Sequence, residues 1–413
     1  MRTRNGCSDG AAPKAPGPEC NLGHARRWEL SGALLATVLL LAFANGANDN
    51  PKGMATLIGC GSISRQRALV LASAATAVGS LGSAVWAPRL AAVFSRGGLL
   101  PSGSQGQPVL AAIALGAVVT ILLATWRGLP VSTTHAIVGA FAGAALASGS
   151  NPRAAAPVLA GLFVPLAISP LIALVLAAGL RSAGRLLDAR YGISQKLCIC
   201  AGSQPVPAVP RTAATASARR TASAAPISAG QVSHLQVLRT ITVSVATKVE
   251  CRRRYSGRLV GIDAERVAEA IHTMSGLSVS LARGMNDTPK IVGLAALSGL
   301  LTPAQLTVAV TAAMACGGVF AARRVAQVMA SGITPMEQGM GLAANLATST
   351  LVGVASPLGL PLSTTHVATG AIAGVGALEA SLRWRSLGEV AAAWVATLPV
   401  AALVAAAATH VLL

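Results

Sequence analysis

The chain of 413 residues carries too little charge for a set of soluble domains. Apolar residues make up 53% of it and charged residues 11%, whereas soluble domains carry about 25% charged residues. We therefore predict a polytopic helical membrane protein. The 32 Lys and Arg residues outnumber the 13 acids, for a net charge of +19. Because these basic residues lie mostly between long uncharged runs, they favour membrane-flanking loops over nucleic-acid binding.

The first half of the chain begins with a polar tail, residues 1–29, followed by an uncharged run over 30–48. A signal peptide is the competing interpretation of this run. We favour a retained helix, because no clean small-residue cleavage site is visible and the run ends in a motif described below. Further uncharged runs cover residues 68–88, 109–126, 128–152 and 156–180. Each is near or above the ~18–20 residues that cross a bilayer.

The second half repeats this pattern, with uncharged runs over 291–322, 338–378 and 390–413. The first two are long enough for more than one pass or for a hairpin. Together the runs predict an all-α membrane protein with about ten to twelve membrane segments, some of them re-entrant. We divide it into a first transmembrane repeat (30–180) and a second (266–413).

A basic linker, residues 181–265, separates the two halves. It holds 13 Lys and Arg residues and two acids between positions 181 and 258. Residues 201–230 are rich in Ala, Ser, Thr and Pro, which predicts a flexible segment. The charge places the linker in the cytoplasm, where it acts as a solvated topology determinant or touches anionic lipid headgroups.

Two motifs occur twice, in the same order. Residues 45–52 (NGANDNPK) agree with residues 283–290 (RGMNDTPK) at five of eight positions, and residues 129–140 agree with 360–371 at eight of twelve. The offsets, 238 and 231, are nearly equal. Two similar halves with Gly- and Pro-interrupted segments are typical of secondary transporters, whose binding sites lie at such positions.

The first motif places Asp49 and Asp287 at or beside the ends of apolar runs. A carboxylate at membrane depth is costly and is usually paired or functional. With Asn48, Asn286 and backbone carbonyls freed by the neighbouring Gly and Pro, the motif predicts an oxygen cage for Na⁺ or a proton. A plain interfacial turn is the alternative, which the duplication disfavours.

The second motif, Pro-X-Ser-Thr-Thr-His, has the features of a helix N-terminus. Its unpaired N–H groups and positive dipole, together with three hydroxyls, favour an oxyanion such as phosphate. Capping alone is the alternative. His135 and His366 follow the hydroxyls and are candidates for proton or substrate contacts, or simple structural partners. Since no Cys and His cluster has zinc-ligand spacing, we expect no resident metal and no cofactor.

These motifs resemble the PiT family of inorganic phosphate transporters, in its bacterial form. The resemblance covers about residues 30–195 and 265–413. It implies an inverted-repeat fold with broken helices, and phosphate near the midplane between the halves. The matching positions for phosphate are Ser132, Thr133, Thr134, Ser363, Thr364 and Thr365, and those for a coupling cation are Asn48, Asp49, Asn286 and Asp287. Some members are Na⁺ symporters; bacterial ones are often H⁺ symporters that carry a metal–phosphate complex.

The sequence thus predicts a symporter of inorganic phosphate in the bacterial inner membrane, coupled to H⁺ or Na⁺. The expected partners are these ions and the lipid bilayer, and nucleic acid is not among them. The sequence leaves open whether the chain forms a homodimer. A sulfate transporter of the same fold is the main alternative, and a channel or an intramembrane enzyme acting on lipid phosphates are further ones. Cation coupling follows from charge, because Asp49, Asp287 and phosphate would crowd three or four negative charges together. Lys52 and Lys290 either offset part of this negative charge or point toward an interface, since each lies three residues past its Asp.

Overall fold

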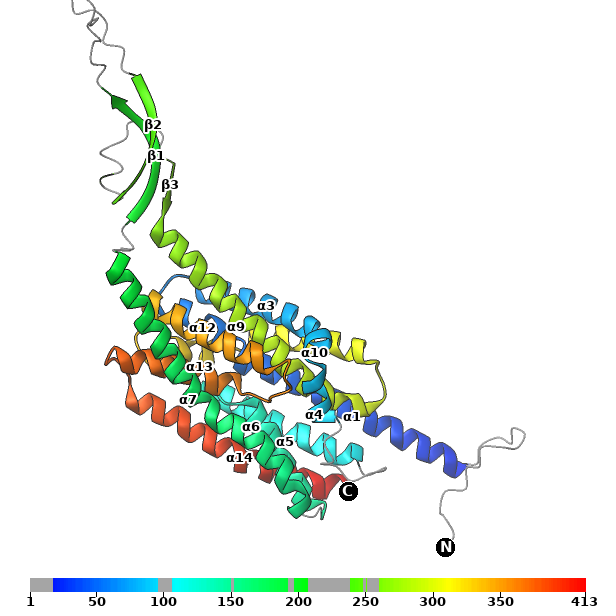
Figure 1. Cartoon of the computed structure of the whole chain (residues 1–413). Coiled ribbons are helices and arrows are strands. Elements are labelled where there is room, and N and C mark those ends of the chain that lie inside the picture. Colours follow the sequence, from blue (N-terminus) through cyan, green and yellow to red (C-terminus); the bar gives the residue numbers. More distant parts are fainter. Residues whose placement is uncertain are drawn as a thin grey trace, which may run out of the picture. The chain divides into compact units, whose positions relative to one another are not determined.

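The computed structural model describes residues 18–95, 106–149, 152–191, 197–206, 238–247, 250 and 260–413. The chain divides into two units, one of Met1–Arg185 with Ile271–Leu413 and one of Leu186–Ala270. Helices build the larger unit (Figure 1). Those of the first half are α1 (Pro18–Asp49), α2 (Pro51–Gly59), α3 (Arg65–Trp86), α4 (Pro88–Ser95), α5 (Gly106–Arg127), α6 (Thr133–Ala147) and α7 (Pro152–Tyr191).

The second half begins with α9 (Ala264–Ala295) and a 3₁₀ turn, η1 (Ala296–Ser298). It continues through α10 (Pro303–Phe320), α11 (Arg323–Gln327), a π-helical turn, η2 (Val328–Gly332), α12 (Gln338–Ala355), α13 (Thr364–Leu378) and α14 (Trp384–Leu412). Helix α10 starts at a capping box formed by Thr302 and Gln305, with Pro303 in its first turn. This combination satisfies free N–H groups and stops the helix from extending backwards.

Within the described residues, six helices are long and apolar enough to cross a membrane. They lie in 28–59, 65–86, 106–127, 163–190, 303–320 and 384–412. This is fewer than the ten to twelve segments expected, which included re-entrant ones. The short helices account for part of the difference: α6 and α13 have 15 residues each, or about 22 Å of helix, too short for a ~30 Å hydrocarbon core.

Many large apolar side chains face outward from these helices. Val85, Val175, Val395 and Leu403 are examples, each more than two-thirds exposed. A soluble protein rarely leaves so much apolar surface uncovered. With spans of this length and composition, the outward side chains indicate a multi-pass membrane protein.

The two halves exchange helix contacts in matching pairs. A Cβ added to Gly46 in α1 would lie 1.9 Å from the carbonyl oxygen of Met314 in α10, and one added to Gly284 in α9 would lie 2.2 Å from that of Thr76 in α3. Gly284 follows Gly46, and Met314 follows Thr76, by the same 238 residues that separate the first motif pair. In each half, the helix that carries the first motif (α1 or α9) therefore packs against a helix of the other half, and the backbones approach closely at small residues.

The short helices follow the same exchange. Gly139 and Gly143 of α6 pack on the backbone of α14, the last helix of the second half, at Leu398 and Ala402. Gly370 and Gly374 of α13 pack on the backbone of α7, the last long helix of the first half, at Pro170 and Leu174. These Gly-xxx-Gly contacts hold the N-termini of α6 and α13 in place.

The helix break expected at both first motifs occurs at one of them. Helix α1 ends at Asp49 and α2 begins at Pro51, yet the amide of Asn50 still donates to the carbonyl of Gly46 (3.1 Å). Helix α9 runs on without interruption through Pro289. A proline removes a single hydrogen-bond donor, and the close packing around α9 keeps the rest of the helix intact.

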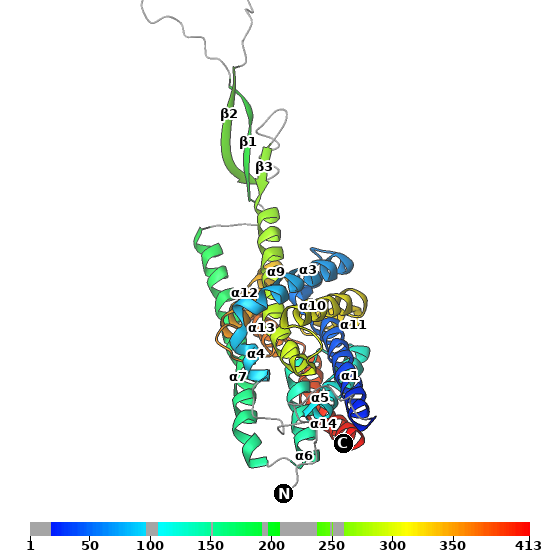
Figure 2. The same cartoon turned by 90° about the vertical axis from the view of Figure 1, so that its right-hand side faces the viewer.

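The smaller unit contains a three-stranded antiparallel sheet with the order β2-β1-β3 (Figure 2). Its strands are β1 (Leu197–Val206), β2 (Leu238–Thr247) and β3 (Val260–Asp263). The all-α expectation misses this sheet, and the flexible linker expected over 201–230 is wrong for residues 201–206, which lie in β1; residues 207–230 are outside the described part. Residues 18–29, expected in the polar tail, already belong to α1.

Candidate functional site

Two helix N-termini carry the Ser-Thr-Thr hydroxyls. Helix α6 begins after Ser132 and α13 after Ser363, and each serine hydroxyl accepts a hydrogen bond from the backbone N–H of the histidine three residues later (3.2 Å). Ser132 and Ser363 both have the extended backbone conformation of a helix N-cap. All six predicted hydroxyl residues are buried, so the positive ends of both helices lie inside the protein.

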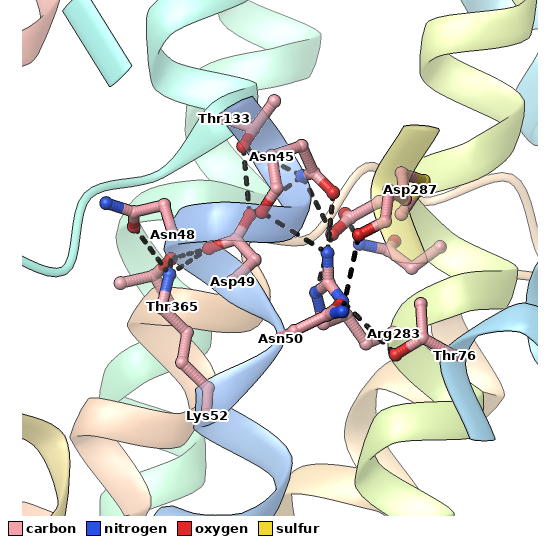
Figure 3. A network of polar contacts seen from close by, with 12 residues as sticks. Asn45, Asn48, Asp49, Asn50, Lys52, Thr76, Thr133, Arg283, Asp287 and Thr365 are labelled. Atoms are coloured by element: carbon pink, nitrogen blue, oxygen red, sulfur yellow. Dashed lines mark hydrogen bonds and ion pairs between the residues drawn. The ribbon is translucent and has the colours of Figure 1, made fainter. Parts of the chain in front are cut away.

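Asp49 joins the two N-termini (Figure 3). Its carboxylate accepts hydrogen bonds from the hydroxyl of Thr133 in α6 (2.9 Å) and from the hydroxyl of Thr365 in α13 (3.3 Å). The amide of Asn45 donates to the same carboxylate (2.8 Å) and to Thr133 Oγ1 (2.9 Å). The ammonium of Lys52 also binds Asp49 Oδ1. One buried anionic group is thus held between two hydroxyl-bearing helix ends.

Asp287 occupies the corresponding place in the second half. Its carboxylate lies 3.4 Å from Arg283 Nε and 3.4 Å from Lys290 Nζ, and it accepts from the amide of Asn286 (2.9 Å). Asn45 of the first half reaches it as well (Nδ2–Oδ2, 3.3 Å). The two carboxylates therefore share a single amide and belong to one polar cluster.

The two lysines cross between the halves. Lys52 donates to the carbonyl of Val131 in its own half (3.0 Å) and to the hydroxyl of Thr365 in the other half. Lys290 donates to the carbonyl of Leu362 in its own half (2.8 Å) and to the hydroxyl of Thr134 in the other half (2.9 Å). Of the two alternatives for these lysines, the structure shows the one in which they stay beside the carboxylates, because the Ser-Thr-Thr segments offer buried oxygen ligands within reach of both.

The charge of the cluster differs from the expected one. Asp49, Lys52, Arg283, Asp287 and Lys290 are each at most 3% exposed. When ionised, these two carboxylates and three cations sum to +1. The expected crowding of three or four negative charges therefore does not arise, since a bound phosphate of charge −1 or −2 would bring the site to 0 or −1. Cation coupling does not follow from charge alone.

A sequence model of the phosphate transporter family matches residues 45–405. The chain belongs to the phosphate transporter family. It is 24% identical to a putative phosphate permease of Pyrococcus furiosus, over 90% of this chain and 94% of that protein. It is 25% identical to a probable low-affinity inorganic phosphate transporter of Mycobacterium tuberculosis, over 90% and 75%. A solved structure described as the sodium-dependent phosphate transporter shares its fold, with a TM-score of 0.67 and 18% identity, over 93% of this chain and 99% of that one.

In this family member the carbonyl ligands come from an unexpected source. The sequence predicted carbonyls freed by Gly and Pro inside the first motif. The carbonyls that the ammonium groups of Lys52 and Lys290 contact belong to Val131 and Leu362, the residue just before each Ser-Thr-Thr. The Asn side chains position these segments: the amide of Asn48 donates to the carbonyl of Leu129 (3.0 Å) and that of Asn286 to Leu362 (3.0 Å). The Asn-Asp pairs thus support the carbonyls as well as the carboxylates.

Arg283 is the main residue whose role the sequence did not reveal. Its guanidinium donates to Asn45 Oδ1 (2.5 Å), to Thr76 Oγ1 (3.2 Å) and to the side chain of Asn50. It stands at the motif position that Asn45 holds in the first half. An arginine inside a membrane-length helix is itself a functional signal, and here it ties α9 to both α1 and α3.

His135 and His366 lie together at the interface of the halves. Their ring centroids are 4.4 Å apart, and the ring of His366 lies 3.9 Å from that of Trp394. Both Nδ1 atoms are buried without a hydrogen-bond partner. Ser132 contacts the backbone of His135 rather than its ring, which gives no support to a Ser–His nucleophile. Among the described residues, no group of three His, Cys, Asp or Glu side chains could hold a metal ion.

Proposed function

We propose that this chain is a secondary transporter that carries inorganic phosphate across a membrane. The observation that carries the proposal is the position of Asp49, whose carboxylate accepts from Thr133 at one helix N-terminus and from Thr365 at the other. Hydroxyls and helix dipoles from both halves converge on one anionic group, which is the arrangement that an oxyanion requires. Membership of the phosphate transporter family supports the same substrate.

The acceptors within the cluster favour phosphate over sulfate. A phosphate ion that carries a proton both donates and accepts hydrogen bonds, whereas sulfate at neutral pH accepts only. Asp49 and Asp287 lie among the hydroxyl and amide donors and share the amide of Asn45. A carboxylate beside a bound sulfate would meet only repulsion, while beside a protonated phosphate it gains a charge-assisted hydrogen bond.

We assign the coupling cation, H⁺ or Na⁺, to the Asn-Asp pairs, Asn48 with Asp49 and Asn286 with Asp287. These pairs bring carboxylate, amide and backbone oxygens together at membrane depth, which is the ligand type for a hard cation or a proton. His135 and His366 stand next to the hydroxyls in sequence and offer a further proton-accepting group.

Uptake into proteoliposomes tests this function directly. Purified protein should accumulate phosphate when a pH or Na⁺ gradient is imposed, each gradient applied separately, with saturation and counterflow that a channel would not show. Unlabelled phosphate should compete with labelled phosphate far better than sulfate does. Equal competition by sulfate would contradict phosphate selectivity and favour a sulfate transporter. An absence of gradient-driven uptake would refute secondary transport.

The hydroxyl assignment is tested by Thr133→Val and Thr365→Val. Each removes one hydrogen bond to a charged group, worth roughly 1.5–3 kcal/mol, so the apparent affinity for phosphate should fall about tenfold or more. Thr397→Val is the matched control, because that buried threonine only donates to the carbonyl of Ala393 in its own helix (2.6 Å). Unchanged affinity in both site variants would place the anion elsewhere.

We further propose that the chain lies in a bacterial inner membrane with residues 181–265 in the cytoplasm. Val243 in β2 is 69% exposed, so a cysteine placed there reports on accessibility. In cells whose other accessible cysteines are replaced, an impermeant thiol reagent should label it only after the membrane is opened. Labelling in intact cells would show that residues 181–265 lie on the outer side of the membrane and would contradict the proposed orientation.

A further inference from the structure

We propose that Lys52 and Lys290 are built-in counter-cations that fill the two oxygen cages of the Asn-Asp motifs, so that phosphate transport by this chain does not use Na⁺ at these positions. The inference rests on the proposed function and names the ion that its coupling sites do not take. It leaves the proton as the coupling ion.

The first cage surrounds the ammonium of Lys52. Its oxygens are Asp49 Oδ1, Asn48 Oδ1 (3.2 Å), the carbonyl of Val131 (3.0 Å) and the hydroxyl of Thr365. A carboxylate, an amide oxygen, a carbonyl and a hydroxyl are the ligands that hard cations select in proteins. The ammonium, a compact point charge, takes the centre of this set and is 2% exposed.

The second cage repeats the first with the halves exchanged. Lys290 Nζ lies 2.8 Å from the carbonyl of Leu362, 2.9 Å from the hydroxyl of Thr134 and 3.4 Å from Asp287 Oδ1. The lysine stands three residues after the aspartate in both motifs, which puts both side chains on one helix face. The second set lacks the Asn amide oxygen of the first, because Asn286 Oδ1 accepts from Ser356 instead. The carboxylate, carbonyl and hydroxyl recur at matching positions of both motifs, which argues against an accident of packing.

The cages also explain how a tethered cation serves transport. Each lysine links an aspartate of its own half to a Ser-Thr-Thr segment of the other half, so it holds both halves together around the anion site. A free Na⁺ cannot share the centre of a cage with the ammonium, and a Na⁺ beside the cage would be repelled by a like charge in a poorly screened interior. Ammonium and Na⁺ therefore exclude each other from the cage.

The first experiment uses the unchanged protein in proteoliposomes. Phosphate uptake driven by a pH gradient should keep the same rate, within about twofold, when all Na⁺ is replaced by choline. A saturable Na⁺ requirement that changes the rate tenfold or more would overturn the proposal. If no phosphate uptake occurs under any gradient, the proposed function fails, and the second experiment alone decides the cage assignment.

The second experiment compares Lys52→Ala with Lys52→Met in detergent. The alanine removes the ammonium and leaves the oxygens free for a small cation, whereas methionine removes the charge but fills the space. NaCl, relative to choline chloride, should raise the melting temperature of Lys52→Ala saturably by several degrees. The methionine variant and the unchanged protein should show no such rise. If a Lys52 variant does not fold, Lys290→Ala and Lys290→Met provide the same comparison at the second cage.

Two results would overturn the assignment in this second experiment. One is an equal Na⁺-dependent stabilisation of the unchanged protein and the alanine variants, which would show that Na⁺ binds elsewhere. The other is an absence of Na⁺ stabilisation in every folded alanine variant, which would show that the oxygens around the lysines do not form a cation cage.

Discussion

Replacing Arg283 by Asn gives the second repeat the residue that the first repeat carries at the same motif position, Asn45. The change removes one of three buried cations and leaves Lys290 as the remaining cationic partner of Asp287, beside the amides of Asn286 and Asn45. Loss of one member of a buried ion pair costs about 3–5 kcal/mol. Because Lys290 Nζ stays 3.4 Å from the Asp287 carboxylate, we expect the lower end of that range.

Arg385→Asn is a matched control within the same chain. Arg385 pairs with Glu389 four residues later on a helix (3.3 Å), as Arg283 does with Asp287, but its side chain is 94% exposed. An exposed helical pair of this spacing contributes about 0.3–0.5 kcal/mol. The two variants should therefore differ by roughly 2.5 kcal/mol or more, although they remove the same side chain from the same kind of pair.

Thermal unfolding in detergent at a fixed scan rate measures the difference. At ~2 °C per kcal/mol, Arg283→Asn should melt at least about 5 °C below Arg385→Asn, which should match the unchanged protein. Arg283→Lys should fall between them, because an ammonium keeps the charge but cannot serve the Asn and Thr acceptors of the guanidinium fork. Equal melting temperatures for Arg283→Asn and Arg385→Asn would refute the buried network as a source of stability.

Three further outcomes are expected. Gly46→Ala should prevent folding or lower the melting temperature by many degrees, since its Cβ would meet a backbone oxygen at 1.9 Å, whereas Gly32→Ala in the same helix, with open space around it, should be neutral or slightly stabilising. Asp49→Asn should abolish or uncouple phosphate uptake; uptake against a gradient with unchanged ion dependence would contradict this. A hydrogen bond from Arg181 lowers the pKa of Glu379 below its ordinary value of ~4.5. The ionised carboxylate therefore stabilises the fold fully above pH ~4.5, and this stabilisation is lost as the pH falls through the folded-state pKa. Glu379→Gln should flatten that acid-side decline in melting temperature, and an unchanged decline would contradict the pairing.

The repeats made much of the site predictable from the sequence. Each motif supplies residue types whose chemistry is evident alone, a buried Asp or three hydroxyls at a helix start. Their duplication at nearly equal offsets then predicts two equivalent sets. The structure brings Thr133 and Thr365, 232 positions apart in the numbering, onto one carboxylate.

The lysines and the arginine were harder to predict, for a physical reason. A lysine three residues after an aspartate near the end of an apolar run fits two environments equally well, a snorkelling position at the interface or a buried ion pair. The choice depends on whether oxygen ligands from elsewhere surround the ammonium. Those ligands, Thr365 for Lys52 and Thr134 for Lys290, come from the opposite half, and no local pattern reveals them.

The small sheet was missed for a different reason. The composition of residues 201–230 is rich in small and polar residues and so predicts flexibility. Residues 238–247 alternate apolar and hydroxyl-bearing side chains, with Ile241, Val243 and Val245 on one face, which is a strand pattern. Its pairing partner, Leu197–Val206, lacks that alternation, and register between strands so far apart depends on pairing rather than on local sequence.

The charged side chains of the cluster bind one another and nearby polar groups because they are buried. Five ionised groups at most 3% exposed cannot be left without partners, because an unpaired buried charge costs several kcal/mol. Asp49 therefore takes the hydroxyls of Thr133 and Thr365, the same donors that we assign to phosphate. On the proposed function, an entering anion competes with Asp49 for these donors, and Asp49, which keeps Lys52 and Asn45, is then free to take up a proton in their place. In the transport that we propose, substrate entry and the change of partner at the Asp49 carboxylate would thus be one event, and that exchange would couple the anion to a proton.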